Sequence, residues 1–115
     1  MTVNIENVRK TVAVLGEIAR ERGKQDAKWG QQDHADMHID ANREAYGAAA
    51  AAYQVVNDEL VANDEPATWD YVLLEEVYEA LGAETHDDSR AELLQVAAVC
   101  VAWVEALDRR EAVAS

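Results

Sequence analysis

The stretch LLEEVYEAL, residues 73–81, decides the fold prediction because it has the pattern of an amphipathic helix. At about 100° per residue, its apolar side chains share one side of the helix: Leu74, Val77 and Leu81. Glu75, Glu76 and Glu79 gather on roughly the opposite side, with no lysine or arginine among them. Like charges three or four residues apart on a helix repel by roughly 0.2–0.5 kcal/mol per pair. The glutamates therefore form either a solvated face or a cluster held by a cation.

The stretch belongs to a helix predicted over 69–83, which follows Pro66 and a potential N-cap at Thr68. Three further helices are predicted, one of them after this helix, over 89–110. Upstream, apolar spacings of three and four predict helices over 4–23 and 41–62. The connection between those two contains Gly23 and Gly30 and is expected to be a loop or a broken helix. With no strand alternation of useful length, the sequence predicts one all-α domain over 1–115, a four-helix bundle.

Composition restricts the partners and the compartment. The chain has 115 residues and a net charge of −13 at pH 7, which argues against a nucleic-acid backbone or an anionic membrane as partner. The single cysteine, Cys100, excludes an intrachain disulfide and is expected to pack as a small core side chain. We find no signal-peptide pattern and no run of about 20 apolar residues. A cytoplasmic location is therefore expected.

The helix expected over 89–110 is apolar around nearly its whole circumference. In so short a chain, such a helix predicts that its outer face meets a second subunit, most simply across a two-fold axis. Glu92 lies at the edge of this apolar surface. It has two interpretations, which do not exclude each other: Ser89 and Glu92 fit a capping box, or Glu92 contributes to a site.

Glu76, Glu79 and Glu92 together would present hard oxygen ligands from two consecutive helices. Magnesium prefers carboxylate oxygens and completes its shell with water and substrate phosphates. Bound divalent ions would cancel the repulsion among the glutamates and would let an acidic protein attract a phosphate ester. A magnesium site of this kind is the second of the two interpretations of the acidic cluster, the one in which a cation holds it together.

These residues resemble a known signature. Glu75-Glu76-x-x-Glu79 followed by Glu92-x-x-Gln95 is similar to the motif of the MazG-like all-α nucleoside triphosphate pyrophosphohydrolases, Glu-Glu-x-x-Glu, a spacer, then Glu-x-x-Asp. The blocks RGKQDAKWGQQDH and ELLQVAAVCVAWVEALDRR resemble small MazG-like proteins of actinobacteria and their phages. Together these blocks cover about half the chain.

The resemblance implies a helical homodimer or tetramer that hydrolyses a (d)NTP to the monophosphate and pyrophosphate with Mg²⁺ or Mn²⁺. By position, Glu76, Glu79 and Glu92 would hold the metal, and Glu75 would be a further ligand or would orient the attacking water. Gln95 stands where the family's main pattern has an aspartate ligand, so it would offer a neutral amide oxygen. This departure leaves a non-catalytic nucleotide- or protein-binding module as the alternative, and an acidic mimic of DNA charge as a third reading.

The front block supplies the candidates for substrate binding. Lys24 and Lys28 would contact the phosphate tail, although exposed lysines near a helix end are the commoner explanation. Trp29 and His34 would stack on or hydrogen-bond the base. Trp29 would otherwise be an apolar plug over the bundle.

Overall fold

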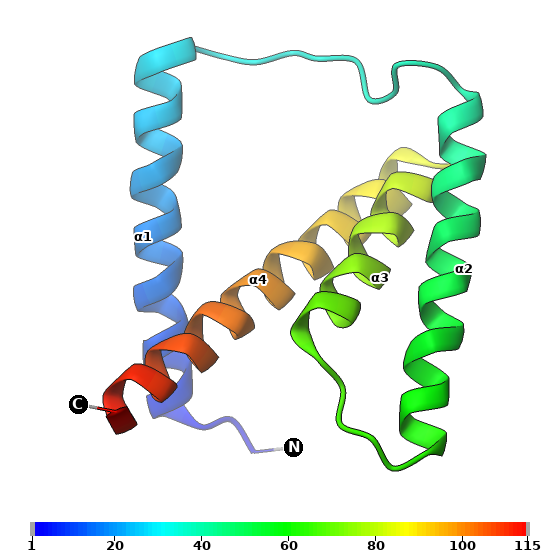
Figure 1. Ribbon diagram of the computed structural model, residues 1–115. Helices are drawn as coiled ribbons and strands as arrows, with labels where there is room; N and C mark the ends of the chain where they lie inside the picture. The colour runs from blue at the N-terminus through cyan, green and yellow to red at the C-terminus, as the bar shows by residue number, and fades with distance from the viewer. Residues whose placement is uncertain (1, 115) are drawn as a thin grey trace. The chain divides into compact units, whose positions relative to one another are not determined.

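The computed structural model describes residues 2–114, which form four α-helices and no strand (Figure 1). The helices are α1 (Ile5–Trp29), α2 (Ala41–Ala62), α3 (Trp69–Gly82) and α4 (His86–Ala114). The predicted all-α class with four helices is confirmed. By backbone contacts the chain divides into two compact units. Unit 1 comprises the residues up to His34 and from Val101 onward, and unit 2 comprises residues 35–100.

Tyrosine packing joins α2 to α3 in unit 2. The chain has four tyrosines, and all of them lie at this contact: Tyr46 and Tyr53 on α2, Tyr71 and Tyr78 on α3. The Tyr53 and Tyr78 rings are almost parallel, with centroids 5.7 Å apart, and Tyr46 stacks on Tyr78 at 6.1 Å. Aromatic pairs at such separations stabilise by about 0.5–1.5 kcal/mol beyond their burial. The tyrosines therefore hold α3 in register against α2.

Two glycines bring the backbones of α2 and α3 together near the end of α3. A Cβ atom built on Gly82 would lie 2.9 Å from both the Cα and the N of Gly47, closer than real Cβ contacts. A Cβ on Gly47 would meet nothing within 4 Å. The close approach therefore depends on Gly82, which also ends α3.

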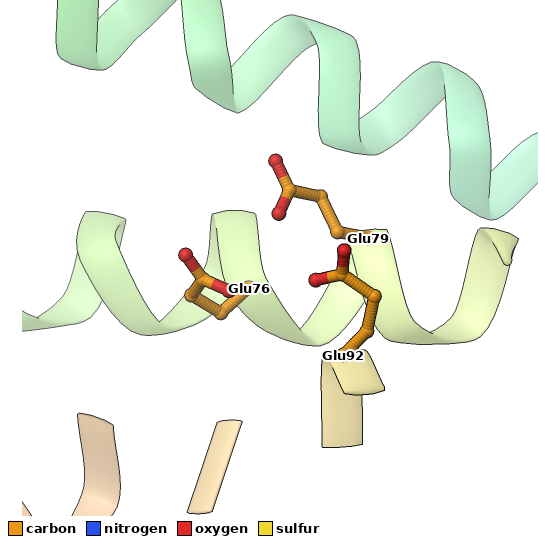
Figure 2. Close-up of side chains that lie close together, drawn as sticks. All are labelled: Glu76, Glu79 and Glu92. Atoms are coloured by element: carbon orange, nitrogen blue, oxygen red, sulfur yellow. The ribbon is translucent and has the colours of Figure 1, made fainter. Parts of the chain in front are cut away.

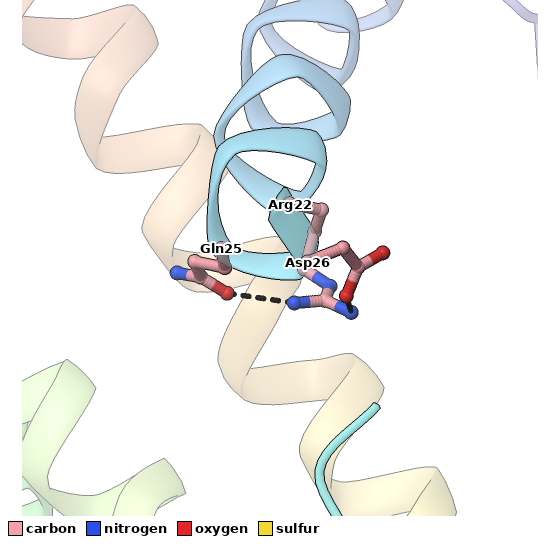
Figure 3. A network of polar contacts seen from close by, with 3 residues as sticks. All are labelled: Arg22, Gln25 and Asp26. Atoms are coloured by element: carbon pink, nitrogen blue, oxygen red, sulfur yellow. Dashed lines mark hydrogen bonds and ion pairs between the residues drawn. The ribbon is translucent and has the colours of Figure 1, made fainter. Parts of the chain in front are cut away.

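Helix α1 is longer than the sequence pattern predicts. Asn4 caps its start, because the Asn7 backbone N–H donates to the Asn4 side chain at 3.2 Å. The predicted end at residue 23 is wrong, since the helix continues through Gly23 to Trp29. Arg22 reaches one turn ahead to Gln25 at 2.7 Å and to Asp26 at 2.9 Å, and these contacts stabilise the added turn (Figure 3).

Gly30 ends α1. Its φ of +67° lies in the left-handed region that favours glycine, and its N–H donates to the Asp26 carbonyl oxygen at 2.8 Å. Residues 31–40 contain no helix or strand and lead to α2. The predicted connection therefore exists, but its first part belongs to α1.

Unit 1 packs α1 against the last part of α4. Val14, Val101 and Ala106 are buried, and the Thr11 hydroxyl donates to the Glu105 carboxylate at 3.1 Å. Helix α4 begins at His86 and extends past the predicted end at residue 110. Cys100 is exposed, so its predicted core position is wrong. Among the helices described here, none combines the length and the apolar character needed to cross a bilayer.

Candidate functional site

Three glutamates from α3 and α4 converge in unit 2. Glu76, Glu79 and Glu92 each contribute a carboxylate oxygen, and these oxygens all lie within 4.8 Å of one another. Figure 2 shows Glu76 and Glu79 along α3, with the Glu92 carboxylate beside them. The structure therefore brings together three of the four residues that were predicted as metal ligands from the sequence, the fourth being Gln95.

Helix α3 is covered along the stretch that carries these glutamates. Every residue from Tyr71 to Ala83 is buried or half-buried, including Glu75, Glu76 and Glu79. The three glutamates are half-buried, so their side chains are still partly open to water. The solvated face and the cation site therefore both stay predictions for the LLEEVYEAL stretch.

The capping-box interpretation of Glu92 is wrong. Helix α4 begins at His86, and Thr85 is its cap: the Thr85 hydroxyl accepts the Asp88 N–H at 3.1 Å, and the Thr85 carbonyl accepts the Ser89 N–H at 2.9 Å. Ser89 therefore lies inside the first turns and Glu92 one turn later. Thr85, with Asp88 three residues later, marks the start of the helix. The start predicted from the sequence lies about one turn too late. The Glu92 carboxylate is consequently available to the cluster.

The two α3 glutamates of the cluster, Glu76 and Glu79, both have raised pKa values. The pKa of Glu76 is raised, first by partial burial and then by the charges of Glu92 and Glu75. The pKa of Glu79 is raised by partial burial and by Glu76, Glu75 and Glu92 in that order. The ion pairs recorded among residues 2–114 join Arg22 to Asp26, Lys24 to Glu21 and His86 to Asp87, so none neutralises the cluster.

This donor set fits a small divalent cation. Magnesium binds carboxylate oxygens at about 2.0–2.1 Å, so two ligands on opposite sides of the ion stand about 4.2 Å apart. The three carboxylate oxygens lie within 4.8 Å of one another, a separation close to that spacing. A bound cation would also remove the mutual repulsion that raises the two pKa values.

An acidic hollow of about 430 Å³ adjoins the cluster in unit 2. Glu79 and Glu92 line it, together with Glu84 and Asp88. Gly47 and Gly82 also line it, so the closest backbone approach of α2 and α3 forms part of its wall. The hollow gives solvent and small ligands access to two of the three clustered carboxylates.

Glu75 has a separate partner, which sequence reasoning missed. The Asn57 side-chain amide on α2 donates to the Glu75 carboxylate at 3.2 Å and to the Tyr71 carbonyl at 3.3 Å. The Asn57 Oδ1 atom is buried and has no hydrogen-bond partner among the described residues. The available signal was a polar residue four positions after Tyr53 and three before Leu60, within the apolar seam of α2. Asn57 therefore holds Glu75 by a hydrogen bond, and the charge of Glu75 contributes to the raised pKa values of Glu76 and Glu79.

The remaining predicted site residues are Gln95 and four residues of unit 1. Gln95 is exposed and follows Glu92 by one turn of α4, and its role as a metal ligand stays a prediction. Lys24 pairs with Glu21 at 3.1 Å on α1, and the Lys28 ammonium lies 4.7 Å from the centroid of the Trp29 ring.

Trp29 is 57% exposed at the end of α1, so its alternative as an apolar plug is wrong. His34 is exposed in the connection that follows. Lys24, Lys28, Trp29 and His34 belong to unit 1 and the glutamates to unit 2. The role of these four residues in substrate binding stays a prediction.

Comparison of the chain with protein-family models, with curated proteins and with solved structures returned no match.

Proposed function

We propose that this protein is a Mg²⁺-dependent hydrolase that converts a (d)NTP to the (d)NMP and pyrophosphate. One observation carries the proposal: the half-buried residues Glu76, Glu79 and Glu92 place carboxylate oxygens within 4.8 Å of one another. A bound cation would relieve the mutual repulsion of these carboxylates. The resemblance of these residues to the MazG-like motif supports a nucleoside triphosphate as the substrate.

The roles follow from chemistry and position. Glu76, Glu79 and Glu92 would hold Mg²⁺ or Mn²⁺, with Gln95 as a neutral further ligand. When bound, the metal supplies positive charge that stabilises the departing pyrophosphate and makes water more acidic. Glu75 is held by Asn57 at 3.2 Å, and its carboxylate orients the attacking water and accepts its proton. Lys24 and Lys28 would contact the phosphate tail, and Trp29 and His34 the base.

A survey of substrates tests the proposal. The pure protein is incubated with each of the eight common (d)NTPs and Mg²⁺ or Mn²⁺, and pyrophosphate release is measured. We expect turnover of at least one nucleotide, and Glu79→Gln lowers kcat/KM by roughly 100-fold or more, since even outer partners of a metal site contribute about 10- to 100-fold. The matched control is Glu59→Gln, the same change at an exposed position of α2. Absence of turnover with all eight nucleotides by folded protein contradicts the proposal.

The second candidate is a non-catalytic helical module that binds a nucleotide or a protein. Gln95 favours it, because an exposed amide replaces the charged ligand of the related motif. Thermal melts with and without Mg²⁺ and nucleotide separate the two candidates. Stabilisation by nucleotide without turnover supports the module and excludes the enzyme.

We further propose that the protein is a homodimer or tetramer located in the cytoplasm. The exposed large apolar side chains support self-association, and they include Ile5, Val8, Val12 and Leu15 on α1 and Leu93, Leu94, Val104 and Leu107 on α4. Exposed apolar side chains that gather on one surface are typical of protein interfaces. A single, exposed cysteine is compatible with a reducing compartment.

A further inference from the structure

We propose that a second hollow in unit 2, lined by Arg43, His86 and Arg90, is a binding site for the phosphate group of a small phosphate ester. This basic hollow has a volume of about 550 Å³ and lies between the start of α2, the end of α3 and the first turns of α4. It shares the lining residue Ala83 with the acidic hollow. The site does not depend on catalysis by the glutamate cluster.

The distribution of charge in unit 2 singles out this hollow. Residues 35–100 contain fifteen Asp and Glu and only two Lys or Arg, namely Arg43 and Arg90. Both arginines line the same hollow although they come from different helices, α2 and α4. Arg43 is half-buried and Arg90 is exposed. Two guanidinium groups that line one hollow in an otherwise acidic unit give an anion a local centre of positive charge.

Arg43 lacks a partner that its burial demands. Its side chain is half-buried, and its Nε atom is fully covered without a hydrogen-bond partner among residues 2–114. The ion pairs recorded in that range include neither Arg43 nor Arg90. A buried donor without an acceptor destabilises the folded protein. Because the Nε atom is covered, a ligand in the hollow would meet the terminal nitrogens of the Arg43 guanidinium group, whose fork matches the oxygens of a phosphate.

The start of α4 adds further attraction for an anion. His86 and Arg90 are one turn apart on α4, and both line the hollow with Ser89 between them. The N-terminal end of a helix carries a partial positive charge that favours phosphate. Asp36 is the one carboxylate that lines the hollow, and His86 contacts Asp87 at 3.3 Å. These acidic groups weaken the attraction without pairing with either arginine.

The walls of the hollow indicate the rest of the ligand. Leu93 and Leu94 line it and are 56% and 57% exposed, and Met37 and Leu81 line it as well. Apolar side chains beside an anion site favour a ligand with an apolar or flat portion attached to its phosphate. A nucleoside monophosphate has this chemistry, whereas inorganic phosphate uses only the basic groups. The geometry therefore favours a phosphate ester over the free ion.

Calorimetric titration in the presence of EDTA tests the site without the metal-dependent reaction. The probes are adenosine monophosphate, inorganic phosphate and adenosine. We expect adenosine monophosphate to bind more tightly than either of the other two, because it alone uses both the arginines and the apolar wall. If inorganic phosphate binds as tightly as adenosine monophosphate, the hollow is a site for the free ion, and the proposal of a phosphate-ester site is wrong.

Substitutions of residues that line the basic hollow test whether adenosine monophosphate binds there. Arg43→Ala and Arg90→Ala should each weaken adenosine monophosphate about tenfold or more, the typical contribution of a hydrogen bond to a charged group. Arg43→Lys and Arg90→Lys keep the positive charge but remove the forked geometry of the guanidinium group, so we expect a smaller loss of affinity than in the alanine variants. These variants keep the test valid if an alanine variant misfolds. Asp36→Asn should tighten binding. Arg110→Ala, an exposed arginine in unit 1, is the matched control and should change nothing.

The outcomes separate this inference from the proposed function. Unchanged binding in folded Arg43 and Arg90 variants, or no binding by the folded wild type, overturns the phosphate site whether or not the protein hydrolyses a (d)NTP. Loss of binding in those variants supports the site even when no (d)NTP is hydrolysed.

Discussion

Single carboxylates of the cluster influence the stability of unit 2. Glu76 and Glu79 have raised pKa values because they are partly buried and lie near other negative charges. A carboxyl whose pKa is higher in the folded than in the unfolded protein opposes folding at high pH. Its penalty is absent below the ordinary value of 4.5, grows as the pH rises, and is complete above the raised pKa. The metal-free cluster therefore destabilises the protein at neutral pH.

Glu79→Gln removes one charge from the cluster and tests this conclusion. Without metal at pH 7, the variant should be more stable than the wild type by roughly 0.5 kcal/mol, the size of a relieved like-charge pair. The difference in melting temperature, roughly 2–3 °C, should shrink as the pH falls toward 4.5. Addition of Mg²⁺ should raise the melting temperature of the wild type only. A variant that is less stable than the wild type without metal at pH 7 would contradict the repulsion within the cluster.

The element scale explains how α3 and α4 place these side chains. Thr85, rather than Ser89, caps the start of α4. Gly82 sets how closely α3 approaches α2. Gly82 lines the acidic hollow and Thr85 caps α4, and neither offers a ligand or a reacting group to the proposed site, so we test both positions through stability.

Thr85→Ala should destabilise the protein by about 1 kcal/mol, because it removes the side-chain acceptor for the Asp88 N–H. Ser89→Ala is the matched control and should have little effect, since Ser89 lies inside the helix. Urea unfolding of both variants gives the comparison. The reverse order of stabilities would restore Ser89 as the cap.

Gly82→Ala should destabilise the protein by about 1–3 kcal/mol, because the new Cβ would meet the Gly47 backbone at 2.9 Å. Gly47→Ala introduces the same methyl group into open space and replaces a glycine within α2. It should therefore be neutral or stabilising by up to about 1 kcal/mol. Thermal unfolding of the two variants measures the difference, and equal effects would rule out the backbone contact.

At the scale of the whole molecule, the protein buries few large side chains. Its buried apolar residues among those described are Val14, Ala50, Ala80, Val101 and Ala106, and no large side chain is fully covered. Half of the sequence is nevertheless hydrophobic. Apolar surface left in contact with water costs about 25 cal/mol per Å². This imbalance favours association with a second copy of the chain.

Light scattering after gel filtration should therefore give the mass of a dimer or tetramer. Val12→Lys, at a position that is 59% exposed on α1, should weaken the association by placing a charge in the apolar stripe. Lys10→Ala, a neighbouring change outside the stripe, is the control. A monomer at every accessible concentration of the wild type would contradict the association.

Local patterns were enough to predict the helical class and most of the helices. The spacing of apolar residues in LLEEVYEAL and in α2 depends only on helix geometry, so the bounds of α2 agree and those of α3 differ by one residue. Helix ends were less predictable because more than one nearby residue can act as a cap. Thr85, not Ser89, caps α4. Side-chain contacts of Arg22 stabilise the turn of α1 that follows Gly23.

By itself, the sequence determined that this protein is acidic and all-α, and it identified which glutamates were candidates for a metal site. Only the tertiary structure decided that Glu76, Glu79 and Glu92 meet, that Asn57 holds Glu75, and that Arg43 and Arg90 share one hollow. The physical reason is that periodicity describes the faces of one helix, whereas convergence depends on how different helices pack. In unit 2 that packing is set by four tyrosines and by the close approach at Gly82.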